Sequence, residues 1–297
     1  MGRPPSTRVE RDPLGEVEVP AEAYYGPQTA RALKNFPISG LRAHGEFIRA
    51  LAQIKRAAAE VNCRLGALEE EVGRAIAQAA REVAEGGLAE EFQVDVFQAG
   101  AGTSLHMNMN EVLANRAAEL LGGRKGDYRR VHPNDHVNFG QSTNDVFPTA
   151  MRLACLRLLG RLLPELSLLA EAFEEKGEEF GSIIKSGRTH MQDAAPVSLG
   201  REFGAYGRTM EKAADTLRSA AEGLHELGIG GSAVGTGLNT LPSYREGVVE
   251  RLRELTGMPL RGAPDLMEAM NSMAPFVTLS AALRGLAVEL TRIANDL

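Results

Sequence analysis

The fold class is decided by residues 145–180, which read DVFPTAMRLACLRLLGRLLPELSLLAEAFEEKGEEF. Apolar side chains recur there at helical spacing, with polar and charged side chains between them. Arg157, Arg161 and Glu165 interrupt the most apolar part, so we expect an amphipathic helix and not a membrane span. Long helices with one apolar face usually pack into bundles, and this run therefore predicts a helical bundle.

Outside this run, the chain is also dominated by helical patterns. We expect further helices over residues 47–65, 68–84, 110–121, 199–227 and from 264 to the C-terminus. Glycine pairs at 86–87 and 122–123 end two of them. Only residues 17–19 have the pattern of a short strand. The sequence predicts an all-α fold, in which a mixed short-helix N-terminal domain over residues 1–138 precedes a long-helix bundle over residues 139–297.

Composition and charge exclude several classes of protein. The chain has 297 residues, of which 43% are hydrophobic and 24% are charged, as in ordinary globular proteins with a sizeable core. The net charge of -6 gives no electrostatic case for binding to nucleic acid or to an anionic membrane. Cys63 and Cys155 have no CxxC partner, so we expect free thiols and a reducing, cytoplasmic location. The polar N-terminus shows no apolar targeting segment.

Four polar stretches separate the expected helices, at residues 98–110, 132–145, 185–196 and 228–242. They are rich in Gly, Ser, Thr, Asn and His, which favour turns and helix caps. Turn formation is therefore one interpretation of these stretches. The other interpretation is a binding site assembled from loops on a rigid helical scaffold, and the repeated occurrence of such stretches favours it.

Two of these stretches offer neutral hydrogen-bond donors that suit a carboxylate. Gly100 and Gly102 allow a ligand to approach the backbone closely, and Thr103 and Ser104 follow with hydroxyl groups. Residues 141–145, QSTND, lead into the long helix, where unpaired backbone N–H groups and the helix dipole favour an anion. Capping of the following helix remains the alternative role for both stretches.

The other polar stretches contain a histidine and a glycine-rich segment. His190 lies in a polar loop beside Thr189, where it could carry a proton or donate to a substrate. Residues 228–237 match G-x-G-x-x-A by letter, but no strand precedes them, so a dinucleotide site is not expected. The segment HPNDH at 132–136 matches no strong zinc pattern. We therefore expect neither a metal ion nor a cofactor.

The order and spacing of the polar stretches are similar to the signatures of the class II fumarase/aspartase superfamily. The matching segments are residues 100–110, 132–150, 187–194 and 235–239. The resemblance extends from Gly15 to Leu297. The AYYG sequence at 23–26, Ala101 and Thr143 resemble the aspartase branch. One departure is His106, which stands where the pattern usually has Asn.

The resemblance implies a lyase that removes ammonia from L-aspartate to give fumarate, by anti elimination through an aci-carboxylate. The implied substrate-binding residues are Thr103, Ser142, Thr143, Asn144, Thr189 and His190. The first three would hold the β-carboxylate, Asn144 and His190 the amino group, and Thr189 the α-carboxylate. A second dicarboxylate site is implied at Arg129, His132, Asn134 and Asp135.

The general base of this family is a serine on a Gly-Ser-Ser loop, which the resemblance places beyond Leu297. No catalytic residue is therefore assigned, the helical bundle is expected to be incomplete, and the 297-residue chain alone is expected to be inactive. The resemblance also implies a homotetramer for the complete protein. Two alternatives stay open: a fumarate hydratase acting on malate and fumarate, and a non-catalytic helical assembly module that keeps the pocket without the base.

Overall fold

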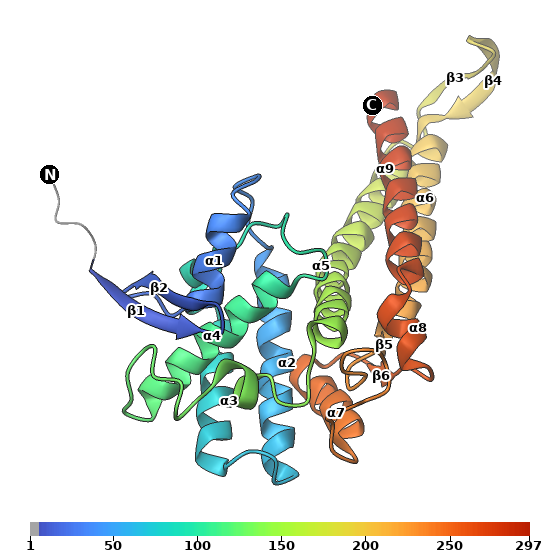
Figure 1. The fold of residues 1–297 in the computed structure, drawn as a ribbon. Helices are drawn as coiled ribbons and strands as arrows, with labels where there is room; N and C mark the ends of the chain where they lie inside the picture. Colours follow the sequence, from blue (N-terminus) through green and yellow to red (C-terminus); the bar gives the residue numbers. More distant parts are fainter. Residues whose placement is uncertain (1–5) are drawn as a thin grey trace, which may run out of the picture. The chain divides into compact units, whose positions relative to one another are not determined.

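A computed structural model describes residues 6–297 of the chain, and residues 1–5 lie outside the described part. The chain is mostly helical with three two-stranded sheets, which confirms the predicted all-α class (Figure 1). It forms two compact units, one up to Ala154 together with His225–Ser272, and one of Cys155–Leu224 with Met273–Leu297. The domain boundary expected near residue 138 stays a prediction, and the compact units divide within the long helix α5 (Thr143–Glu179).

The first unit is built on helices whose apolar faces pack against one another. Its helices are α1 (Pro27–Asn35), α2 (Gly45–Arg64), α3 (Glu70–Ala84), α4 (Thr103–Leu120), the start of α5, α7 (Tyr244–Thr256) and α8 (Leu266–Asn271). Helix α2 is central, because it contacts both α3 and α7. Its side chains Leu51, Ile54, Ala58 and Val61 recur at helical spacing and are buried, as expected for a helix that faces a core.

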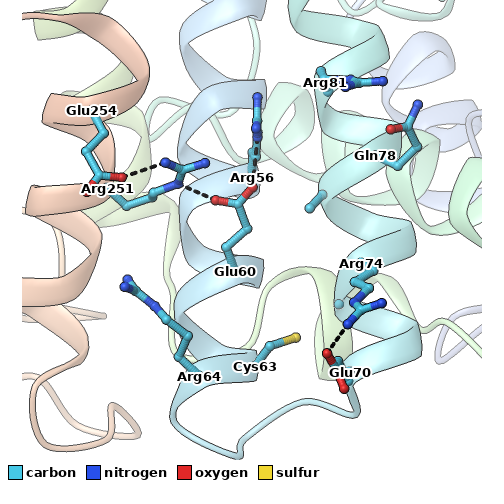
Figure 2. Close-up of a pocket in the computed structure, with 12 residues that line it drawn as sticks. Arg56, Glu60, Cys63, Arg64, Glu70, Arg74, Gln78, Arg81, Arg251 and Glu254 are labelled. Carbon is cyan, nitrogen blue, oxygen red and sulfur yellow. Dashed lines mark hydrogen bonds and ion pairs between the residues drawn. The ribbon is translucent and has the colours of Figure 1, made fainter.

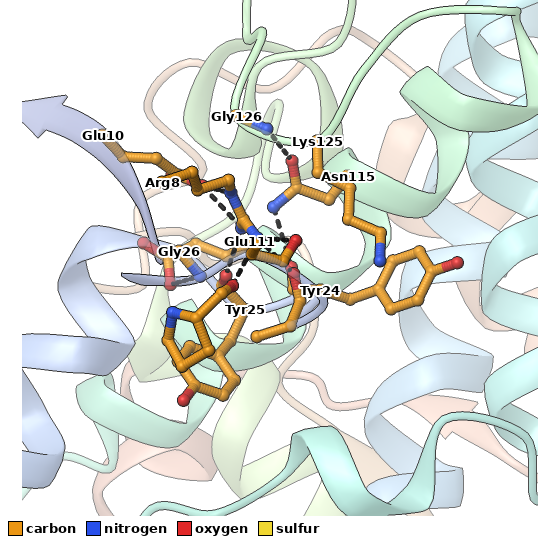
Figure 3. A network of polar contacts seen from close by, with 12 residues as sticks. Arg8, Glu10, Tyr24, Tyr25, Gly26, Glu111, Asn115, Lys125 and Gly126 are labelled. Carbon is orange, nitrogen blue, oxygen red and sulfur yellow. Dashed lines mark hydrogen bonds and ion pairs between the residues drawn. The ribbon is translucent and has the colours of Figure 1, made fainter. Parts of the chain in front are cut away.

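Short elements complete this unit. They are the strands β1 (Thr7–Asp12) and β2 (Gly15–Pro20), the parallel pair β5 (Glu226–Leu227) and β6 (Arg261–Gly262), and the short turns η1 (Ala89–Glu91) and η2 (Pro133–Val137). The β1–β2 hairpin is attached by Arg8, whose guanidinium donates to the carbonyl groups of Pro20, Ala21, Ala23 and Tyr25 (Figure 3).

A buried carboxylate ties the following segment to α4. Glu111 accepts hydrogen bonds from the backbone N–H groups of Gly26, Gln28 and Thr29 and from the Thr29 hydroxyl. Figure 3 shows Glu111 beside Gly26 within this polar network. These donors lie around the first turn of α1, whose N–H groups lack helical partners, so one acidic side chain satisfies several of them.

The second unit consists of the remainder of α5, the helices α6 (Leu199–Ala221) and α9 (Ala274–Asp296), and a hairpin of β3 (Ile184–Thr189) and β4 (Gln192–Ser198). It also includes most of the short helix η3 (Glu222–His225), because the unit ends at Leu224. Helices α6 and α9 run side by side (Figure 1). Their shared core contains the buried Met210 and Leu217 of α6 and the buried Leu279, Leu286 and Ile293 of α9. Among the described residues, none of the helices combines the length and apolar character that a membrane span requires.

Two expectations about local structure were wrong. Helix α4 begins at Thr103 and not near residue 110, because Asn108 and Asn110 are buried inside the helix and do not start it. The Asn108 amide donates to the carbonyl of Glu91 at 3.0 Å, a distant segment that sequence periodicity cannot reveal. The strand expected at residues 17–19 is confirmed within β2, but it is not the only strand, and helices α1 and α7 were not expected.

The polar stretch 185–196 is a β-hairpin and not a loop. Its turn residues His190 and Met191 both adopt left-handed backbone angles, with φ of 55° and 61°. Two successive residues with positive φ are typical of the tight turns that join antiparallel strands. These turns usually contain Asn or Gly, so the His-Met pair gave no signal of a hairpin.

Candidate functional site

The N-terminal ends of α4 and α5 lie close together in the first unit. Gly102 precedes α4 in a left-handed conformation, with φ of 83°, and a Cβ atom there would overlap the ring of Phe147 in α5. Phe147 in turn packs against Phe47 of α2, with ring centroids 4.7 Å apart and the rings tilted by 60°. The loop before α4 is thereby fixed against the first turns of α5, and Thr103 follows directly.

The sequence that begins α5 presents hydroxyl and amide groups with partial access to solvent. Ser142 and Thr143 are half-buried, and Asn144 is exposed. The Ser142 hydroxyl accepts a hydrogen bond from the backbone N–H of Asn144, and the Asn144 amide donates to the carbonyl of Ala233 at 2.8 Å. Hydroxyl groups beside a helix N-terminus, where the dipole favours negative charge, form an arrangement suited to a carboxylate.

Asp145 holds this helix start in place. Its carboxylate accepts hydrogen bonds from the backbone N–H groups of Ser142 at 2.9 Å, Gly230 at 3.1 Å and Ser232 at 3.0 Å. The bond to Ser142 is of the kind found in helix capping boxes, so capping is part of the function of this stretch. Burial raises the pKa of the Asp145 carboxyl to about 6, although the three N–H groups and Lys55 act in the opposite direction.

A buried lysine lies beneath the same loop. The Lys55 ammonium on α2 donates to the side-chain oxygens of Asn138 at 2.8 Å and Gln141 at 2.9 Å. Burial lowers the pKa of Lys55 well below its ordinary value, and the carboxylate of Asp145 opposes this shift. Lys55 fixes residues 138–141 immediately before the hydroxyl-rich turn. Lys55 was not among the predicted site residues, although a lysine on the apolar face of α2, next to Ile54, is unusual.

His106 contacts the turn from the α4 side. Its Nδ1 atom lies 2.7 Å from Oγ1 of Thr143, within hydrogen-bond distance. Burial, together with the nearby Lys55, lowers the pKa of His106 well below its ordinary value. The structure thus brings Ser142, Thr143 and Asn144 together at the start of α5 and supports them with Lys55, His106 and Asp145. Thr103 is exposed at the start of α4, the helix that carries His106.

Thr189 and His190 belong to the second unit, on the hairpin of β3 and β4. Thr189 ends β3 and pairs with Gln192, and His190 occupies the turn. Both side chains are exposed on the hairpin. Thr103 and residues 142–144 therefore lie in the first unit, and Thr189 and His190 lie in the second.

The second set of predicted residues surrounds the short turn η2. His132 caps this turn, because its Nδ1 atom accepts from the N–H groups of Asn134 and Asp135 at 3.2 and 3.1 Å. Arg129 is exposed and forms an ion pair with Asp127 at 2.6 Å. An anion that binds Arg129 would have to compete with Asp127. Within residues 6–297, no group of three or more His, Cys, Asp or Glu side chains is placed to hold a metal ion.

A groove of about 450 Å³ lies elsewhere in the first unit, between α2, α3 and α7 (Figure 2). Arginine and glutamate side chains dominate its lining, and most of them pair with each other, as Arg56 and Arg251 do with Glu60. It contains none of the predicted site residues. Its lining carries five arginines and three glutamates and no hydroxyl side chain, so its chemistry differs from that of the turn at residues 142–144.

Comparisons with known proteins show the family of the chain. A family model described as lyase matches residues 15–297. The aspartate ammonia-lyase of Bacillus subtilis (strain 168) is 48% identical over 290 residues, which cover 98% of this chain and 61% of that protein. A class II fumarate hydratase of Ralstonia nicotianae is 50% identical over 293 residues, which cover 98% of this chain and 64% of that protein.

Solved structures show the same relationship. A fumarate lyase:delta crystallin from Brucella melitensis bound to cobalt superposes with a TM-score of 0.96 at 46% identity, over 98% of this chain and 64% of that one. The chain therefore belongs to a family described as lyase and has a helical fold. The chain belongs to the fumarase/aspartase superfamily. It spans about three fifths of the length of the curated relatives that it matches.

Proposed function

We propose that a protein carrying this chain at the full length of its relatives eliminates ammonia from L-aspartate to give fumarate. One observation carries the proposal: Thr103, Ser142, Thr143 and Asn144 gather donors at two neighbouring helix N-termini. Neutral hydroxyl and amide groups with access to solvent at helix N-termini suit a carboxylate better than any cation.

In this reaction a base removes a proton from Cβ, and the electron pair moves through an aci-carboxylate. The Cα–N bond then breaks, a Cα–Cβ double bond forms and ammonia leaves. Negative charge grows on the β-carboxylate during proton removal, so donors fixed around it lower the barrier. We assign Thr103, Ser142 and Thr143 to that carboxylate, Asn144 and His190 to the amino group, and Thr189 to the α-carboxylate. The base is left unassigned in this chain.

Asp145 and Lys55 support these groups without touching the substrate in this proposal. Asp145 accepts hydrogen bonds from the N–H of Ser142 and from two N–H groups of the loop at 230–232. These bonds hold the hydroxyls of Ser142 and Thr143 in place while negative charge grows on the β-carboxylate. Lys55 restrains the residues before them through Asn138 and Gln141. Such restraint is what makes donors effective, because they need no reorganisation during the reaction.

A second candidate is a fumarate hydratase, since a class II fumarate hydratase is as similar to the chain as an aspartate ammonia-lyase. The two activities are distinguished by assaying purified protein of full family length with L-aspartate and with L-malate. Fumarate absorbance is followed in both assays, and released ammonia is followed in the first. Ammonia release with little turnover of malate supports the proposal. Turnover of malate alone supports the hydratase, and turnover of neither contradicts both.

The remaining assignments are also proposals. We infer a second dicarboxylate site at Arg129, His132, Asn134 and Asp135, a cytoplasmic location, and a homotetramer at full length. Support for assembly comes from apolar side chains left exposed on long helices, including Leu168 of α5 and Val277 and Val288 of α9, each at least 58% exposed. Light scattering tests the homotetramer, and a fully active monomer would contradict it.

A further inference from the structure

The contact between His106 and Thr143 joins a fully buried ring to a half-buried hydroxyl. His106 is 1% exposed, and its Nδ1 atom lies 2.7 Å from Thr143 Oγ1. The other ring nitrogen, Nε2, is buried and has no hydrogen-bond partner among the described residues. Burial keeps the ring neutral by lowering its pKa, so it carries a single N–H group.

A neutral histidine carries its proton on one ring nitrogen or the other, and this choice determines whether the Thr143 hydroxyl can donate a hydrogen bond to a ligand. If Nε2 carries the proton, Nδ1 must accept, and it takes the only proton of the Thr143 hydroxyl. Thr143 could then only accept from a ligand, which is the wrong polarity for a carboxylate. If Nδ1 carries the proton, the ring donates to Oγ1, and the hydroxyl proton is free to point elsewhere.

The burial of Nε2 distinguishes the two arrangements. A proton on Nε2 would be a buried donor without an acceptor, and such a donor costs about 1–3 kcal/mol. A bare Nε2 leaves only an unused lone pair, and unsatisfied acceptors are tolerated better than unsatisfied donors. The surroundings of His106 therefore favour the proton on Nδ1.

We propose that His106 is a positioning residue that donates from Nδ1 to Thr143 and so turns the Thr143 hydroxyl into a donor for a carboxylate ligand. The inference rests on the proposed function, because it deepens the role of Thr143 in binding the substrate. His106 acts on the ligand only through Thr143. Its ring fixes the direction of one hydroxyl before the ligand arrives, which reduces the ordering that binding requires.

The tautomer can be read directly by solid-state ¹⁵N NMR of the histidine-labelled chain. The two ring nitrogens differ widely in chemical shift according to whether they carry a proton. The spectrum of His106→Asn identifies the signals of His106 by their loss. We expect a neutral ring with a protonated Nδ1 and a bare Nε2. A protonated Nε2, alone or in a charged ring, would overturn the proposal, and this measurement does not depend on any enzymatic activity.

A double-mutant cycle tests the route through Thr143, using the Kd of succinate, a dicarboxylate without a leaving group. His106→Leu, which cannot donate, should raise this Kd about tenfold, whereas His106→Asn retains an amide donor and should raise it about threefold or less. In a Thr143→Val background, His106→Leu should have no further effect. An equal effect in both backgrounds would overturn the proposal. Tight, His106-dependent succinate binding without turnover of aspartate or malate would instead contradict only the proposed reaction.

Discussion

Thr29 donates both its backbone N–H and its hydroxyl to a single oxygen of the buried Glu111, at 3.1 and 2.6 Å. Burial raises the pKa of the Glu111 carboxyl, and the hydrogen bonds from Thr29, Gln28 and Gly26 act in the opposite direction. Glu111 stands on α4 and Thr29 on α1, so this contact joins the N-terminal segment to the helix that begins at Thr103.

Replacement of Glu111 by Gln should therefore lower the free energy of unfolding by about 2–3 kcal/mol, because an amide N–H₂ would face donors that are left unsatisfied. Thr29→Val removes only the hydroxyl donor and should cost about 1 kcal/mol. Denaturant titrations measure both. Equal stability of Glu111→Gln and the unmodified chain would show that the buried hydrogen bonds contribute nothing net.

The raised pKa of Asp145 predicts a pH dependence of stability. Its ordinary value is about 3.9 and its folded value is about 6, so the folded state holds the proton more tightly. The resulting stability is fully present below pH 4 and is lost as the pH rises through 6, by roughly 3 kcal/mol. Asp145→Asn should therefore lack this decline in denaturant titrations between pH 4 and pH 6.

Asp127→Asn is the matched control for that measurement. Arg129 lowers the pKa of the half-buried Asp127 to about 2, so folded Asp127 does not titrate between pH 4 and pH 6. The control variant should keep the decline of the unmodified chain. If both variants show the same slope, Asp145 does not titrate as described.

The proposed role of Ser142 and Thr143 in binding the β-carboxylate predicts that substitutions there lower activity more than stability. In protein of full family length, Thr143→Ala or Ser142→Ala should lower turnover by about 10²–10³, the loss typical for one donor to a developing oxyanion. Ser142→Ala should also cost about 1 kcal/mol of stability, because the hydroxyl caps the N–H of Asn144. Wild-type turnover combined with a much lower melting temperature would assign these residues to capping alone.

The hairpin of the second unit should be stabilised by Met191→Gly. Met191 is 97% exposed and has φ of 61°, so its side chain packs little and its backbone is strained by about 1 kcal/mol. Met191→Ala retains that strain and serves as the control. Hydrogen exchange of the β3 and β4 amides should slow in the glycine variant only. Equal exchange in both variants would argue against strain at this turn.

The sequence predicted those helices that have a clear apolar face at helical spacing. The run at 145–180 corresponds to α5, and residues 47–65 and 68–84 correspond to α2 and α3. The start of α4 was missed because Asn108 and Asn110 are polar but buried inside the helix, and the amide of Asn108 donates to the distant Glu91. Long-range hydrogen bonds of this kind leave no trace in local periodicity.

The sequence predicted the hydroxyl-bearing residues of the site, but it did not predict the residues that hold them in place, His106 and Lys55. The hydroxyls of residues 142 and 143 were identified from their place before a long helix. The partner of Thr143 was not, because His106 reaches it only when the beginnings of α4 and α5 come together. Lys55 was overlooked for a similar reason, since its acceptors Asn138 and Gln141 lie far along the chain.

The lack of a side chain at Gly102 limits which substitutions this chain can accept during evolution. Any other residue would place a carbon where the ring of Phe147 lies, and it would also have to adopt a left-handed backbone. A smaller neighbour at 147 would relieve the crowding and leave the dihedral cost, about 1 kcal/mol, in place. No single missense change at this codon is therefore expected to be neutral, and saturation mutagenesis of position 102 should recover only glycine at full stability.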